Sequence, residues 1–139
     1  MTPETPDSTN PASWKFKQSF RVTYYETDGQ RRVHHSNYLK YFERGRIEML
    51  REAGIRYKDL EDNGFMLVVT EMNLRYQAAA EFDDLLTLTT TVTKIGKVRI
   101  QHHYAIDRDG QTIVEADSTI ACIGKTGKPT RLPDCFFRN

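Results

Sequence analysis

Four segments in the second half of the chain alternate apolar and polar residues with the two-residue period of a β-strand. They span residues 66–76, 86–92, 100–106 and 114–122. Alternation of this kind predicts half-buried strands that turn one face toward a core. The dipeptide Asp109-Gly110, between the last two segments, is typical of a tight hairpin. The pattern therefore predicts an antiparallel sheet whose inner face needs an apolar cover.

A single long helical pattern is available to cover that sheet. It spans about residues 38–53, and Gly54 is placed to end it. At about 1.5 Å per residue the helix is roughly 24 Å long, enough to cross a small sheet. Gly45 is costly in a helix interior and indicates a close approach there, while Ala116 and Ser118 leave room for a helix. The apolar face of this helix comprises Tyr38, Tyr41, Phe42, Gly45 and Met49, with Leu39, Ile47 and Leu50 at its margins.

A fifth strand is predicted ahead of the helix. Phe16, Phe20, Val22 and Tyr24 fall on one face of an alternating segment. The stretch 57–64, between the helix and the next strand, has the character of a short turn. One long helix and an antiparallel sheet of about five strands make an α+β domain.

Length and composition set the domain organisation. The chain has 139 residues, the size of one domain with a substantial core. Residues 1–13 are rich in Pro, Thr, Ser and Asp and lack apolar periodicity, so we predict a disordered tail followed by one domain over 14–139. Cys122 and Cys135 lie far apart without metal-ligand spacing, and we expect reduced thiols.

The charge distribution limits the partners. The formal net charge is +1, with acidic and basic residues interspersed, which argues against nucleic acid or an anionic membrane as a partner. No apolar run approaches the roughly 20 residues of a membrane helix, and the N-terminus lacks the basic and apolar regions of a signal peptide. The expected location is therefore the cytoplasm, with no membrane span.

The segment between the first strand and the helix carries the candidate chemistry. Asp28 follows the strand that Tyr24 ends, and Ser36 or Asn37 is a suitable N-cap for the helix. A helix start exposes unpaired amide groups and the positive end of the helix dipole. A substrate carbonyl can be polarised there beside the Asp28 carboxylate, so a base and an oxyanion site would share one pocket.

These residues resemble the hot-dog-fold acyl-CoA thioesterases of the 4-hydroxybenzoyl-CoA thioesterase type. That family has an Asp after its first strand, a short loop, an aromatic residue or His seven positions on, and Asn-Tyr opening the central helix. Asp28, His35, Asn37 and Tyr38 fall on those positions, and Tyr24 matches an aromatic residue four positions before the Asp. Spacing, order and structural context agree.

The resemblance extends over most of the chain. It includes Glu43 in the helix and the stretch 76–84, which looks like the strand-turn-strand junction of the family, and it covers roughly residues 15–133. It implies a hot-dog fold, with the sheet wrapped around the helix, and hydrolysis of an acyl thioester. Asp28 would be the nucleophile or the general base, and backbone amides near His35 would polarise the carbonyl.

Several side chains would assist in such a site. The His35 imidazole would orient substrate or water. Tyr24 would hydrogen-bond Asp28 or line the acyl pocket, although a packed structural tyrosine is an equal alternative. Asn37 and Tyr38 would lie beside the substrate, with Asn37 also capping the helix.

The loop departs from the family pattern at two positions. Arg31 and Arg32 stand where the family usually has Gly and an apolar residue, so Gly29 would supply a positive φ if the loop needs one. The two guanidinium groups would then contact phosphates or an acidic substrate, or point into solvent. Lys97 and Arg99 match the nucleotide-binding basic residues of the family loosely, and a solvated sheet edge is the alternative.

The expected assembly and cofactors follow from the same reasoning. Open sheet edges favour pairing with a second copy, and the resemblance implies the same, so we expect a homodimer or homotetramer with active sites across the interface. The substrate would be an acyl-CoA or an acyl-carrier protein with a small or medium acyl group. We predict no cofactor beyond the substrate's coenzyme A. We also predict no metal, because adjacent histidines on extended backbone point to opposite faces.

Two other functions remain open on the sequence alone. A hot-dog enoyl-CoA hydratase or dehydratase would pair His35 with Glu43 or Glu48, and Asp28 would then have no role. A protein that binds acyl-CoA without hydrolysing it is the second alternative.

Overall fold

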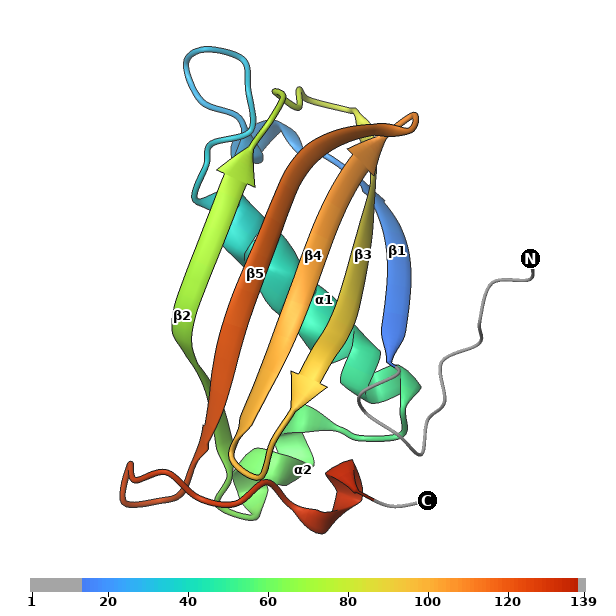
Figure 1. Ribbon diagram of the computed structural model, residues 1–139. Coiled ribbons are helices and arrows are strands. Elements are labelled where there is room, and N and C mark those ends of the chain that lie inside the picture. Colours follow the sequence, from blue (N-terminus) through green and yellow to red (C-terminus); the bar gives the residue numbers. More distant parts are fainter. Residues whose placement is uncertain (1–13, 138–139) are drawn as a thin grey trace, which may run out of the picture.

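The computed structural model describes residues 14–137, so the predicted tail over residues 1–13 lies outside the described residues. It contains one sheet and one long helix, as the periodicity predicts (Figure 1). The elements in chain order are β1 (Lys15–Arg21), α1 (Asn37–Glu52), α2 (Tyr57–Asp62), β2 (Met66–Tyr76), β3 (Leu85–Ile95), β4 (Arg99–Arg108) and β5 (Gln111–Ile123). Short 3₁₀ turns cover Tyr24–Glu26 and Asp134–Phe136.

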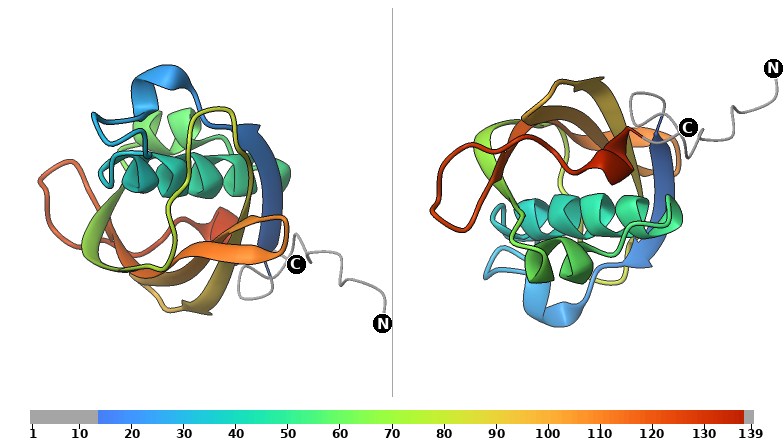
Figure 2. Two further views of the ribbon diagram at one scale, coloured as in Figure 1. Left: turned by 90° about the horizontal axis from the view of Figure 1, so that it is seen from above. Right: turned by 90° about the horizontal axis from the view of Figure 1, so that it is seen from below.

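The sheet has five strands in the order β1-β3-β4-β5-β2, and every neighbouring pair is antiparallel. It curves around α1, which lies along its inner face (Figure 2). The turn between β4 and β5 places Asp109 at φ 50° and Gly110 at φ 81°, the conformation that favours this dipeptide in tight hairpins. The predicted α+β arrangement, with a sheet of about five strands around one long helix, is confirmed.

The centre of the predicted apolar face of α1 is buried, and so is Leu50 at its margin, whereas Ile47 is half-buried and Leu39 is exposed. Gly45 marks the closest approach, since a Cβ placed there would lie 2.3 Å from Oγ1 of Thr90 and 2.8 Å from Cδ2 of Leu88. Gly54 ends the helix region with φ 84°. The core forms two clusters, one around the first half of α1 with Phe42 and one around its second half with Met49.

Two local predictions are wrong. β1 ends at Arg21, and Tyr24 belongs to a 3₁₀ turn rather than to the strand, because the Glu26 carboxylate accepts the Thr23 amide at 2.8 Å and turns the chain. The stretch expected to be a simple turn contains α2, whose Leu60 is buried against the core. The alternation of apolar residues predicts neither the Glu26–Thr23 hydrogen bond nor the packing of Leu60.

No helix within residues 14–137 is long and apolar enough to cross a membrane. Cys122 is buried in the core, and within the same range no disulfide joins it to Cys135.

Candidate active site

The loop from β1 to α1 is tied to the segment that connects β2 to β3. The Val22 amide donates to the Asp84 carbonyl at 3.0 Å, and the Val33 amide donates to the Ala80 carbonyl at 2.8 Å. Between these anchors, Thr27 and Val33 form an isolated antiparallel bridge that closes a small loop. The sequence from 28 to 32 is therefore held at the end of the sheet where α1 begins (Figure 1).

Asp28 is held by the loop itself. Its Oδ1 atom accepts the Gln30 amide at 2.8 Å and the Arg32 amide at 3.4 Å. The Gln30 hydrogen bond lowers the pKa of Asp28 below the ordinary 3.8, with the Arg32 amide adding to the effect. Asp28 is consequently a carboxylate at neutral pH. It is ionised as predicted, but the amides that stabilise it belong to the loop and not to α1.

The strained backbone position of this loop is Arg31. Its φ is 68°, in the left-handed region, and its amide donates to the Asp28 carbonyl at 3.0 Å. The positive-φ glycines of the described residues do not include Gly29, so the expectation that Gly29 supplies this conformation is wrong. The hydrogen bonds around Asp28 require the turn at Arg31, where a Cβ costs energy that glycine would avoid. Both Arg31 and Arg32 have exposed side chains.

The start of α1 is capped differently from the prediction. Ser36 occupies the N-cap position but makes no side-chain capping bond, and Asn37 is the first helical residue. The Asn37 side-chain amide donates instead to the Glu26 carbonyl at 2.8 Å. Nδ1 of His34 accepts the Ser36 amide at 3.2 Å, and the His34 carbonyl accepts the Asn37 amide at 2.9 Å. The 3₁₀ turn around Glu26 creates this arrangement, which the sequence spacing does not reveal.

His35 lies at the mouth of a cleft beside the helix start. Its ring stacks on His34 at 4.3 Å, and its carbonyl accepts the Tyr76 hydroxyl at 3.4 Å. The two neighbouring rings do not point apart, because this segment is a turn and not a strand. The His35 amide has no acceptor among the described residues, so it is available to a ligand. The cleft has a volume of about 280 Å³ and is lined by Arg32, Val33, His35, Tyr38, Tyr76 and residues 77–79.

Tyr38 forms the inner wall of this cleft. It is buried and packs edge-on against Tyr41 and Tyr76, with ring centroids 5.7 Å away in both cases. Burial, followed by the neighbouring Tyr76, raises the pKa of Tyr38 to about 12. The phenol therefore stays protonated and can donate a hydrogen bond. Burial and then the Glu26 carboxylate raise the pKa of the adjacent Tyr41 as well.

An ion pair braces the stretch 77–84 beneath the cleft. Arg108 donates to the Asp84 carboxylate at 2.7 Å and to the Ala79 carbonyl at 3.0 Å. Asp84 also accepts the Glu81 amide at 2.8 Å. Partial burial alone would raise the pKa of Asp84, but the Glu81 amide and Arg108 hold it below the ordinary value. The sequence predicts a strand-turn-strand junction over this stretch but does not reveal the brace, because Arg108 lies on a strand that is distant in the sequence.

Other predicted site residues lie apart from Asp28 within the chain. Tyr24 is 76% exposed and contacts the Phe82 ring at 5.5 Å, and no hydrogen bond joins it to Asp28 among the described residues. Lys97 and Arg99 are exposed at the turn from β3 to β4. That turn follows the last residue of β3, whereas the loop from β1 to α1 is bonded to Asp84 just before its first residue, so the two lie at opposite ends of the sheet (Figure 1), separated by the roughly 33 Å length of β3.

A larger cavity lies between the second half of α1 and the sheet. We call it the helix–sheet cavity. Its volume is about 520 Å³, and its walls are mostly apolar, with Leu50, Val69 and Phe136 among them. Its lining also includes polar side chains, among them Glu43, Arg46, Tyr57, Glu61 and His102. A pocket of this size and polarity is typical of a small-molecule site. The resemblance includes Glu43, and His102 belongs to the alternating segment 100–106, but the sequence does not predict the cavity that they share.

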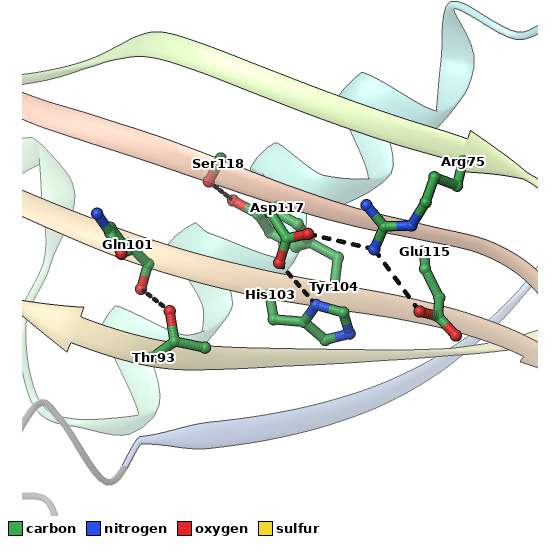
Figure 3. Close-up of polar contacts among 8 residues, drawn as sticks. All are labelled: Arg75, Thr93, Gln101, His103, Tyr104, Glu115, Asp117 and Ser118. Atoms are coloured by element: carbon green, nitrogen blue, oxygen red, sulfur yellow. Dashed lines mark hydrogen bonds and ion pairs between the residues drawn. The ribbon is translucent and has the colours of Figure 1, made fainter.

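The outer face of the sheet carries a separate polar cluster, shown in Figure 3. His103 lies 2.8 Å from the Asp117 carboxylate, and Arg75 lies 3.2 Å from Asp117 and 3.7 Å from Glu115. His103 and then Arg75 hold the pKa of Asp117 below its ordinary value. Because successive residues of β4 alternate between faces, this cluster lies opposite the cavity. No group of three or more metal-ligating side chains occurs within residues 14–137.

Known proteins have this fold and a similar sequence. The pattern of the thioesterase-like superfamily matches residues 22–138. The acyl-CoA thioesterase YbgC of Haemophilus influenzae is 33% identical over 121 residues, covering 85% of this chain and 88% of the relative. A probable thioesterase from Bartonella henselae superposes with a TM-score of 0.82 at 32% identity, covering 86% and 99% of the two chains.

A further structure with this fold belongs to an enzyme that cleaves a named acyl-CoA. A DHNA-CoA thioesterase from Staphylococcus aureus superposes with a TM-score of 0.83 at 28% identity, covering 88% of this chain and 83% of that enzyme. The family match spans both the Asp28 loop and the helix–sheet cavity. The chain therefore belongs to the thioesterase-like superfamily and is a thioester hydrolase with the hot-dog fold.

Proposed function

We propose that this enzyme hydrolyses the thioester of a small or medium acyl group carried by coenzyme A or by an acyl-carrier protein, with Asp28 as its central catalytic residue. One observation carries the proposal. An ionised carboxylate, stabilised by the Gln30 amide, lies on the loop that leads to a cleft containing the unpaired amide of His35. A thioester carbonyl at that amide would be polarised as negative charge develops on its oxygen.

Two chemical routes fit this arrangement. In the first, an Asp28 oxygen bonds to the thioester carbon, the C–S bond breaks, the thiolate leaves, and water hydrolyses the resulting anhydride. In the second, Asp28 removes a proton from water as the water attacks the same carbon. The lowered pKa of Asp28 favours the first route, because a weak base remains ionised but accepts protons poorly. Water is the only co-reactant in either route, so the proposal includes no cofactor or metal.

The neighbouring side chains have supporting roles in this proposal. The exposed His35 ring orients the thioester or the water, and the protonated Tyr38 hydroxyl contacts the bound substrate in the cleft. Asn37 acts indirectly by tying α1 to the Glu26 carbonyl. Tyr24 contacts the substrate only at the exposed edge of the loop.

The proposed assembly is a dimer through β2, or a tetramer of such dimers. β2 is an edge strand, and its exposed apolar residues include Met66, Val69 and Tyr76. Antiparallel pairing of two β2 strands about their middle would place Tyr76 beside Met66 of the partner subunit. The cleft at the start of α1, which Tyr76 lines, would then lie next to the partner's helix–sheet cavity, which is lined by residues 67–69.

This assembly also accounts for the distant basic residues. In the antiparallel dimer, the turn carrying Lys97 and Arg99 in one protomer would lie at the same end as the Asp28 loop of its partner. Arg31 and Arg32 are exposed on that loop. We propose that these cations bind the phosphates of coenzyme A, since guanidinium and ammonium groups pair well with phosphate.

A hydratase receives less support from the site. His35 lines the cleft at the helix start, whereas Glu43 lines the helix–sheet cavity. Glu48 forms an ion pair with Arg51 on the helix surface. A catalytic histidine and carboxylate would have to share one cleft, and these residues do not do so within a protomer.

The test is a thiol-release assay over aryl, short-chain and medium-chain acyl-CoAs with wild type and Asp28→Asn. We expect the variant to lose activity by at least about a hundredfold, as loss of a nucleophile or general base does. Asp109→Asn is the matched control, because Asn tolerates positive φ in the hairpin and lies outside the site. Equal rates for wild type and Asp28→Asn would refute the mechanism.

The assembly is tested by light scattering. We expect wild type to be dimeric or tetrameric at micromolar concentration and Val69→Arg to shift toward monomer and lose activity. Leu85→Arg changes an equally exposed apolar residue outside β2 and should keep the wild-type assembly. A monomeric wild type with full activity would contradict the shared site.

A further inference from the structure

His102 contributes a buried imidazole to the wall of the helix–sheet cavity. Its side chain is only 5% exposed, it lines the helix–sheet cavity, and its Nδ1 atom has no partner among the described residues. A buried polar group left unpaired costs free energy, so such groups in native proteins require an explanation. Burial, and then the positive charge of Arg46, lower the pKa of His102 to about 3. The ring is therefore neutral and offers one donor and one acceptor nitrogen.

Arg46 is the second polar group of this cavity. It is half-buried and donates to the Tyr104 hydroxyl at 3.0 Å, and that hydroxyl lies 2.7 Å from the Ser118 hydroxyl. Within the described part of the chain, Arg46 forms no ion pair. A guanidinium group has five N–H donors, so this cation retains donors for a ligand.

The remaining walls limit what the ligand can be. Around His102 and Arg46 the cavity is lined by apolar side chains that include Met49, Ile100 and Ile120. Glu43 and Glu61, both exposed, also line the cavity. Their two carboxylates disfavour an anionic group on the part of the ligand that the cavity holds. The walls suit a hydrocarbon that carries one neutral oxygen.

We propose that the helix–sheet cavity holds the distal part of the acyl group, and that His102 and Arg46 select acyl groups bearing a hydroxyl or keto oxygen there. This inference rests on the proposed thioesterase function and specifies its substrate class. An unsubstituted chain fills the same space but leaves the imidazole unpaired, whereas the oxygen-bearing chain pairs with it. Sites that hydrogen-bond a substrate oxygen discriminate strongly against the analogue without it.

The experiment compares octanoyl-CoA with octanoyl-CoAs that carry one hydroxyl on the distal half of the chain. Wild type should show a kcat/KM at least about tenfold higher for the best hydroxylated substrate. His102→Leu should abolish this preference and improve the reaction of octanoyl-CoA itself. His102→Asn, which keeps a donor and an acceptor, should retain part of the preference.

His103→Leu is the matched control. It changes the adjacent histidine, which lies on the outer face of the sheet beside Asp117, and should leave the substrate preference unchanged. Circular dichroism establishes that the variants are folded. His102→Leu should not reduce stability, because replacing an unpaired buried polar group by an apolar one of similar size is close to neutral.

The outcomes separate this inference from the proposed function. If wild type hydrolyses both substrates equally well, or if His102→Leu keeps the preference, the inference is wrong and the thioesterase function stands. If wild type hydrolyses no acyl-CoA, the thioesterase mechanism fails. In that case, calorimetry with octanoate and its hydroxylated forms tests whether the cavity selects an oxygen-bearing chain, independently of hydrolysis. A His102-dependent preference for the hydroxylated acid supports the selection, and equal binding overturns it.

Discussion

Oδ1 of Asp28 accepts the amide hydrogen of Gln30 at 2.8 Å, so the proposed catalytic carboxylate is held by its own loop. The amides at the start of α1 are left for other partners, and the His35 amide has none among the described residues. This separation lets one group stay ionised while another polarises a carbonyl, without the two competing for the same hydrogen bond. The loop also explains why Arg31 is strained, because the turn that brings the amides to Asp28 passes through it.

The ionisation of Asp28 is measurable. In carbon-13 NMR of the side-chain carboxyls, the Asp28 signal should titrate with a pKa below 3.8, because the Gln30 amide stabilises the charged form. The signal is assigned by its loss in Asp28→Asn. If Asp28 acts as the nucleophile, kcat/KM should fall only as the pH drops through this low value. A pKa raised above 3.8 in the assembled enzyme would instead indicate a general base in a desolvated site.

Replacing Arg31 by glycine should relieve the loop. Arg31→Gly is expected to leave the free energy of unfolding unchanged or to raise it by up to about 1 kcal/mol, because glycine adopts φ 68° without a Cβ clash. Arg32→Gly, at a neighbour without positive φ, is the matched control and should lower stability by about 0.5–1 kcal/mol. Urea unfolding measures both. Equal destabilisation by the two substitutions would contradict the strain at Arg31.

The contact at Gly45 predicts a large cost for a small side chain. Gly45→Ala should destabilise the fold by about 1–3 kcal/mol, although alanine favours helix, because its Cβ would meet Thr90 and Leu88. Thr90→Ala removes the nearest clashing atom and should recover part of this loss in the double variant. Thermal unfolding of the four proteins of this cycle gives the coupling energy. Strict additivity would show that the helix shifts away instead.

Burial of His102 makes stability depend on pH. Its pKa is about 3 in the folded protein against an ordinary 6.5, so between these values the unfolded chain binds a proton that the folded protein does not. Stability should therefore fall as the pH drops below 6.5, by about 2 kcal/mol at about pH 5 from this group. His102→Leu should lose this dependence. Urea unfolding of both proteins at several pH values tests it, and parallel curves would contradict the linkage.

Much of the fold was predictable because its signals are local. β2 spans 66–76 as its alternation predicts, and the hairpin at Asp109-Gly110 forms with both residues at positive φ. The buried face of α1 and the close contact at Gly45 also agree with the pattern. In each case a repeat of two or 3.6 residues, or a turn dipeptide, contains the information.

The candidate site was only partly predictable. Spacing identified the Asp28 loop and the entry to α1, and the structure places His35 and Tyr38 in one cleft there. It did not identify the contact of His34 with Ser36 just before the helix, or Arg108 as the brace of the stretch 77–84. The His34 contact depends on a local turn, which the alternation of apolar residues does not predict. The Arg108 contact joins segments that are distant in the sequence.

The sequence by itself determined the α+β layout, the helix face and the position of Asp28, because hydrophobic periodicity and turn chemistry act over neighbouring residues. Only the tertiary structure decided that Arg31 takes the left-handed turn, that Lys97 lies a sheet length away from Asp28, and that His102 is a neutral imidazole facing a cavity. The physical reason is that backbone strain, distance and desolvation are set by what other segments place around a residue.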